Sequence, residues 1–212
     1  MAIQVIGGTS GAIAETDPTF KSVRTSLRPA EVLGWYSVGG VSGLLTGVAA
    51  AGPVFSLRNI SANLLIVRRV AVTFGTTTAF TTAQALGYGL FFARSFSASD
   101  TGGTALAITG SQNKHRTSLA TPTSLDCRIS STAALTAGTR TLDTVALAAT
   151  YGSSTAVGTS MPVTPLLSND AGDYPVVLAQ NEGLVVTNLI AMGAAGVINL
   201  SVNIEFAEAT SF

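Results

Sequence analysis

The chain offers few side chains that could act as a nucleophile, an acid or a base. It contains one histidine, His115, and one cysteine, Cys127. A Ser-His-Asp arrangement would have to use His115, which lies in the polar stretch GSQNKHRTS, and no Gly-x-Ser-x-Gly turn is present to hold a serine nucleophile. We therefore expect a solvated loop histidine, with a pH-responsive contact as the alternative, and predict that the chain is not an enzyme.

A glycine-rich segment near the start, VIGGTSGAIAE at Val5 to Glu15, looks like the cofactor turn of short-chain dehydrogenases. Its context argues against that function. Asp17 and Pro18 fall where the helix after the turn would run, and no alternation of strands and helices follows. The family's tyrosine with a lysine four residues later is also missing. We predict that no dinucleotide or other cofactor binds here.

Metal and phosphate sites have equally little support. A single cysteine excludes both an intramolecular disulfide and a zinc site with several thiolates from one chain, so Cys127 is expected to be a small core residue. Asp170 and Asp173 in SNDAGDYP are interpreted as turn-forming acids, with calcium binding as the alternative. The chain contains no Gly-Lys pair of the kind found in phosphate-binding loops.

Charge is sparse and balanced. Eleven basic and eleven acidic residues make up 10% of the chain, which argues against a nucleic-acid partner and favours association with other protein. The start, MAIQVIGG, lacks the pattern of a secretory signal, so we expect a protein made in the cytosol. The charge-free stretch 32–57 is long enough to span a bilayer, but Gly, Ser and Pro53 interrupt it. We expect a loop or a partly buried subunit contact there, and no membrane partner.

Strand patterns dominate the rest of the chain. Near its end, apolar residues alternate with polar ones in a way typical of a strand with one buried face: Ile198, Leu200, Val202, Ile204 and Phe206. A second strand at 63–74 would place Leu64, Ile66, Val70, Val72 and Phe74 on one face. Further strands are expected at 54–58, 87–96, 124–130, 140–149, 176–178 and 184–191, with a short helix at 77–87. This content predicts an all-β fold, a jelly-roll or Greek-key β-sandwich.

Two features suggest contacts with other molecules. Residues 1–29 have no sustained period, which predicts an irregular N-terminal arm before a single sandwich domain at 30–212. We expect the arm either to pack on its own domain or to be donated to a neighbouring molecule. The spaced apolar residues of the arm and two aromatic residues after it are candidate interface anchors: Ile3, Val5, Phe20, Val23, Leu27, Trp35 and Tyr36. The pair Arg68 and Arg69 would point to opposite faces of a regular strand. One of them would then interrupt an apolar face and need a partner.

Several distinctive stretches, among them RTSLRP, RISSTAALTAGTRTLD and PVVLAQNEGLVVTNLIAMGAAG, resemble a group of tailed-bacteriophage proteins that look like virion components. The resemblance implies a structural role and carries no catalytic residues. It suggests a capsid decoration or cement protein that binds the major capsid protein in the virion. The sparse charge and the apolar, small-residue stretch from Trp35 to Phe55 predict a small symmetric oligomer, such as a homotrimer. The alternatives are a tail, baseplate or head-fibre component, or a host-surface module that binds carbohydrate.

Overall fold

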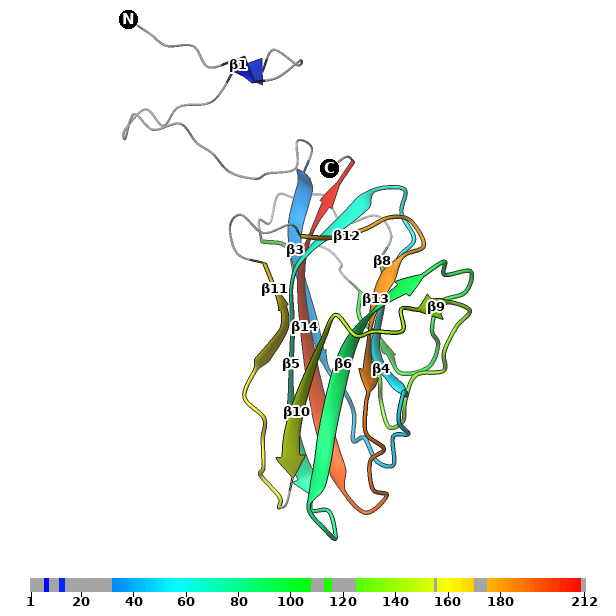
Figure 1. The fold of residues 1–212 in the computed structure, drawn as a ribbon, viewed down its shortest axis with the longest axis vertical. Coiled ribbons are helices and arrows are strands. Elements are labelled where there is room, and N and C mark those ends of the chain that lie inside the picture. Colours follow the sequence, from blue (N-terminus) through cyan, green and yellow to red (C-terminus); the bar gives the residue numbers. More distant parts are fainter. Residues whose placement is uncertain are drawn as a thin grey trace, which may run out of the picture.

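Two antiparallel β-sheets packed face to face form the body of the protein (Figure 1). The computed structural model describes residues 6–7, 12–13, 32–107, 113–115, 125–154, 156–169 and 175–210. Within these ranges every regular element is a strand, so the chain has the all-β sandwich fold predicted from its sequence. No helix in the described part is long and apolar enough to cross a membrane.

The first sheet has the order β11-β5-β14-β3, with β12 also paired to β5. Its strands are β3 (Val32–Val41), β5 (Leu64–Thr78), β11 (Thr164–Ser168), β12 (Val176–Leu178) and β14 (Val197–Ala209). The second sheet has the order β10-β6-β13-β4-β8-β7, with β9 paired to β6. Its strands are β4 (Pro53–Asn59), β6 (Gln84–Arg94), β7 (Thr104–Ala105), β8 (Leu125–Ile129), β9 (Thr141–Leu142), β10 (Ala148–Ser154) and β13 (Gly183–Asn188). Strands β1 (Ile6–Gly7) and β2 (Ala12–Ile13) pair with each other.

The connectivity is that of a jelly roll. The first and last strands of the sandwich, β3 and β14, pair with each other. The next two strands inward along the chain, β4 and β13, pair in the opposite sheet. The pattern continues with β5 and β11 in the first sheet and β6 and β10 in the second. Eight strands therefore wrap as four antiparallel pairs that alternate between the sheets, which is the double Greek key of this architecture.

An insertion between β6 and β10 extends the second sheet. It contributes β7 and β8, and β8 pairs with β4 at the sheet edge. A buried ion pair holds the insertion in place, because Arg140 Nε and Nη2 each donate to one carboxylate oxygen of Asp100 at 2.8 Å. The Gly138 amide donates to the same carboxylate. The acid is therefore fully bonded in its buried position, as a desolvated charge requires.

The core lies between the sheets, and β14 supplies its central row. Its five alternating apolar residues are fully buried, as the sequence pattern predicted: Ile198, Leu200, Val202, Ile204 and Phe206. Tyr36 on β3 packs against Phe206 with ring centroids 5.5 Å apart and is also fully buried. Cys127 is buried beside Leu57 on the neighbouring strand, which confirms the prediction of a core cysteine.

The predicted face of β5 is wrong in its first half. Glu205 and Phe206 of β14 pair with Arg69 and Val67, so Arg68 is an extra residue on β5, a β-bulge. Leu65 and Val67 therefore face the core before the bulge, and Val70, Val72 and Phe74 face it afterwards. Both arginines consequently lie on the outer face, and neither interrupts the core as a regular strand would have required.

Three other expectations also need correction. No helix forms at 77–87, because β5 continues to Thr78 and β6 begins at Gln84. The stretch 32–57 is mostly two strands, β3 and β4, joined by residues 42–52, and is not a loop. The predicted strand at 140–149 is interrupted between β9 and β10. In the first two cases strand pairing with distant parts of the chain overrides the local pattern, and in the third both pieces pair with β6 while residues 143–147 leave the sheet.

The bulge makes a deletion experiment possible. Deleting Arg68 would leave a regular strand in which Val67 and Val70 still face the core, so we expect the free energy of unfolding to fall by no more than about 1 kcal/mol. Deleting Val67 would carry Arg68 into the core or turn Leu65 outward, and we expect a loss of about 3 kcal/mol or more. Urea unfolding followed by fluorescence measures both. Equal losses in the two variants would contradict the assigned bulge.

Candidate interaction face

The outer face of the first sheet carries the main grouping of functional side chains. Strand pairing aligns Ser37 of β3, Glu205 of β14, Arg69 of β5 and Ser168 of β11 in one polar row across the sheet. Neighbouring strands lie about 4.8 Å apart, so side chains in such a row are within reach of one another. An ion pair joins its centre, with Arg69 Nη1 3.6 Å from Glu205 Oε1.

A parallel apolar row lies one step along the strands. Trp35 pairs with Ala207, Ala207 with Ile66, and Ile66 with Val177 of β12. These residues pack into a cluster separate from the main core, in which Ile66 and Ala207 are buried while Trp35 and Val177 remain partly exposed. The outer face is therefore a mosaic in which an apolar strip borders a polar one.

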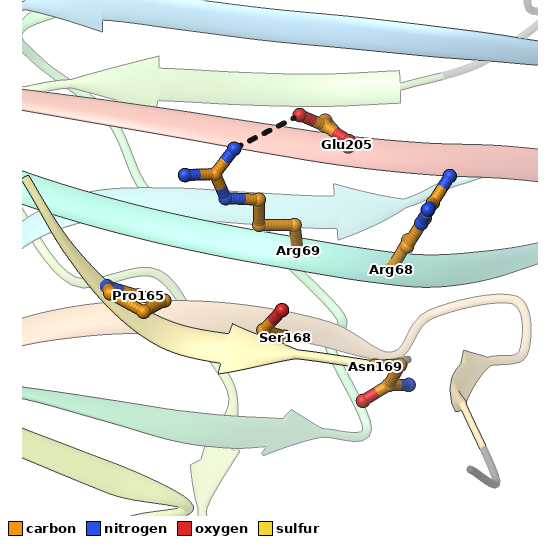
Figure 2. A pocket seen from close by; sticks show the side chains of 6 residues that line it. All are labelled: Arg68, Arg69, Pro165, Ser168, Asn169 and Glu205. Carbon is orange, nitrogen blue, oxygen red and sulfur yellow. Dashed lines mark ion pairs between the residues drawn. The ribbon is translucent and has the colours of Figure 1, made fainter. Parts of the chain in front are cut away.

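Over the polar row, the surface is hollowed by about 290 Å³ (Figure 2). The lining comes from β5, β11, the residue after β11, and β14: Arg68, Arg69, Pro165, Ser168, Asn169 and Glu205. Figure 2 shows the two arginines rising from neighbouring positions of β5 on the same side as Glu205. The guanidinium of Arg68 lies 6.0 Å from the ring centroid of Trp35, so it is placed over the end of the apolar row.

One outer edge of this face is covered by residues 113–115. The Ser37 amide donates to the Asn113 carbonyl, and the His115 amide donates to the Trp35 carbonyl. His115 Nε2 also lies 2.7 Å from Ser37 Oγ, and the His115 side chain is exposed. The expected solvated loop histidine is thus an edge residue of the face, and its hydrogen bond ties it to the polar row.

The predicted interface residues have different outcomes. Trp35 lies on the outer face, at the end of the apolar row. Tyr36 is the next residue on the same strand and points to the opposite side, so it is a core residue and not an exposed anchor. Asp170, Asp173 and Arg116 lie outside the described residues. The predicted anchors of the arm also lie outside them: Ile3, Val5, Phe20, Val23 and Leu27.

Sequence patterns did not single out some of the most exposed apolar side chains. Tyr151 on β10 is 63% exposed and lies over Gly87 on β6. Val41 and Leu44, where β3 ends, are 63% and 55% exposed. Gly87 was a possible sequence signal for the position of Tyr151, because any side chain at residue 87 would collide with the Tyr151 ring. This contact can be recognised only once the pairing of β6 with β10 is known.

The reactive groups of the described residues are few. No group of three or more His, Cys, Asp or Glu side chains that could hold a metal ion occurs among the described residues. Burial, followed by the nearby charge of Asp126, raises the pKa of the Cys127 thiol. Less thiolate is then available at any given pH, so this cysteine is a poor nucleophile. The arginines, the hydroxyls and the apolar row can instead hold a partner in place.

Comparisons with known proteins add little to this geometry. No family model and no curated protein matches the sequence. Solved structures of infectious bursal disease virus, of the Gx strain and of a T13 particle, are 14% and 16% identical to it. The alignments cover 93% and 92% of this chain and 45% and 43% of those chains, with a TM-score of 0.20 in both cases. The chain thus spans less than half of theirs, and a TM-score this low supports no conclusion about function.

The burial of Cys127 leads to a simple test. In the folded protein we expect the thiol to resist an aromatic disulfide reagent at pH 8, since it is buried and its pKa is raised. In denaturant the same reagent should release one equivalent per chain within seconds. Labelling of the folded protein should be no faster than its unfolding. Complete reaction of the folded protein within the mixing time would contradict the burial of this residue.

Proposed function

We propose that this chain is a non-enzymatic structural protein of a virus particle, and specifically a decoration or cement protein on the capsid of a tailed phage. In this role it binds the major capsid protein from outside and stabilises the capsid lattice in the assembled virion. The outer face of the first sheet is the principal docking surface, and residues 1–29 add a second contact.

The observation that supports this proposal most directly is the mosaic outer face. A protein partner requires apolar area to bury together with polar groups that fix the orientation, and the rows through Trp35 and Arg69 supply both. The described residues contain no metal cluster. The resemblance of several sequence stretches to virion components of tailed phages points the same way, and so does the low content of charge.

The alternatives fit less well. A carbohydrate-binding module usually presents several aromatic side chains on one surface. In the described part of the chain Tyr151 lies on the second sheet and Trp35 on the first, so the two do not share a platform. A tail, baseplate or head-fibre location would use the same kind of face. It differs only in which virion protein is bound.

The proposal includes self-association as a homotrimer or another small ring. Val41 and Leu44 are large apolar residues that are exposed in the charge-poor stretch around β3, so we expect them to lie in the contact between copies. Light scattering at micromolar concentration should give about three times the chain mass of 21.4 kDa. Leu44→Glu should lower that mass, whereas Val145→Glu, at a 77% exposed site in the β9–β10 connection, should not. A monodisperse monomer would contradict the oligomer.

A second prediction concerns the arm. Deleting residues 1–29 leaves β3, which begins at Val32, complete, so the sandwich should fold. We expect the truncated protein to occupy undecorated phage particles at least tenfold less tightly, because apolar anchors contribute roughly 1.5 to 3 kcal/mol for each large side chain buried. Sedimentation with particles measures the occupancy. Equal binding by the truncated protein would remove the arm from the proposal, and failure of the full chain to bind any virion component would overturn the proposed function.

A further inference from the structure

Among the described residues, one guanidinium in the hollow on the outer face makes no ion pair. Arg69 is paired with Glu205, but loosely, at 3.6 Å. Arg68 makes no ion pair or side-chain hydrogen bond with any described residue, and its guanidinium lies over the ring of Trp35. The described lining of the hollow contains two arginines and one carboxylate, so these side chains together carry a net positive charge, although the whole chain is neutral.

The placement of Arg68 comes from the backbone. A regular β5 would have pointed one arginine inward, and the bulge instead gives both guanidinium groups to the same hollow. Bulges are frequent beside functional sites, where they redirect a side chain. A second irregularity lies opposite, where Leu166 of β11 is an extra residue between Pro165 and Leu167. Irregular strands thus line the hollow from both sides.

The charge of the hollow selects the class of ligand. A guanidinium presents parallel N–H donors that match the two oxygens of a carboxylate. The one surplus positive charge of the described lining balances a carboxylate monoanion, whereas a phosphate dianion would leave one negative charge unbalanced beside Glu205. The exposed hydroxyl of Ser168 offers a further hydrogen bond at the rim. A carboxylate held by Arg68 and shared with Arg69 fits these groups.

The neighbouring apolar row indicates what carries the carboxylate. Ile66 precedes the bulge on the same strand as Arg68, and Trp35 lies beside Arg68. In an extended peptide, side chains two positions apart lie on the same side and are separated by roughly 6.5 to 7 Å. A segment with an acidic residue and an apolar residue two positions later would therefore reach the hollow and the apolar row together.

We propose that the Arg68–Arg69 hollow is a carboxylate-binding site that recognises an extended acidic-apolar segment of a protein partner. This inference rests on the proposed function in taking the outer face as the docking surface, and it adds the chemistry of the partner. Arg68 supplies the principal bond to the carboxylate, Arg69 exchanges part of its contact with Glu205 for the ligand, and Trp35 covers the apolar residue.

The test uses the purified full-length chain, whose single tryptophan, Trp35, has its ring centroid 6.0 Å from the Arg68 guanidinium and so reports on the site. The probe is a blocked six-residue peptide with Asp at the third position and Leu at the fifth, titrated at low salt. One matched peptide carries Asn in place of Asp, and another carries Ala in place of Leu. We expect the Asp-Leu peptide to change the fluorescence saturably and to bind at least tenfold more tightly than either matched peptide. Acetate and inorganic phosphate are titrated separately.

Variants then assign the binding to the two arginines. Arg68→Gln and Arg69→Gln should each weaken the Asp-Leu peptide at least tenfold, and Arg68→Lys should restore only part of the affinity because it loses the bidentate geometry. Arg94→Gln is the matched control, since Arg94 belongs to the second sheet and pairs with Asp143 and Glu182. It should bind the peptide as the unaltered protein does. Thermal melts establish whether each variant is folded. If Arg68→Gln does not fold, the variant that lacks Arg68 replaces it.

Several results would overturn the inference. These are no saturable binding of the Asp-Leu peptide at millimolar concentration, equal binding of the Asp and Asn peptides, or full binding by folded Arg68→Gln. Phosphate binding more tightly than the acidic peptide would indicate a phosphate site instead. This outcome can be distinguished from that of the proposed function. If the protein binds no virion component but peptide binding depends on Arg68, the proposed function is wrong and the carboxylate site stands. If Arg68→Gln binds particles fully and the peptide does not bind, the carboxylate site is wrong and the proposed function stands.

Discussion

The structure depends on how β5 keeps its apolar side toward the second sheet along its whole length. This strand and β14 form the centre of the first sheet and pair over thirteen positions. Burial of Leu65 and Val67 at one end and of Val70, Val72 and Phe74 at the other requires a change of phase between them. The extra residue at Arg68 supplies that change. Without it, one half of the strand would turn its apolar residues to solvent or place an arginine in the core.

The same constraint creates the candidate site. Because the bulge keeps the apolar residues of β5 in the core, both arginines lie on the outer face. There Arg69 pairs with Glu205 in the polar row, and Arg68 lies over Trp35 in the apolar row. The jelly-roll pairing brings these residues together from positions 35, 66–69, 168 and 205 of the chain. The described part of this face is a sheet surface with an open hollow at the two arginines. It can present many weak contacts to another surface.

The second sheet is specialised in a different way. Its edge is extended by the insertion that contains β7 and β8, and the buried Asp100–Arg140 pair joins two parts of this insertion. A desolvated charge pair contributes little net stability, but removing either partner leaves an uncompensated charge, so it fixes one arrangement of the insertion. The first sheet thus carries the exposed mosaic of arginines and apolar residues, and the second carries the buried ion pair that anchors its insertion.

The sequence by itself determined the class of fold and the character of its clearest strand. Period-two alternation placed Ile198 to Phe206 in the core, and composition identified Cys127 as buried, because both depend on local chemistry alone. Strand order, the bulge at Arg68 and the separation of Trp35 from Tyr36 were decided only by the tertiary structure. Register is set by pairing between residues far apart in the chain, and a shift of one position exchanges the two faces of a strand. The alignment of Arg69 with Glu205 therefore appears only once β5 and β14 lie side by side.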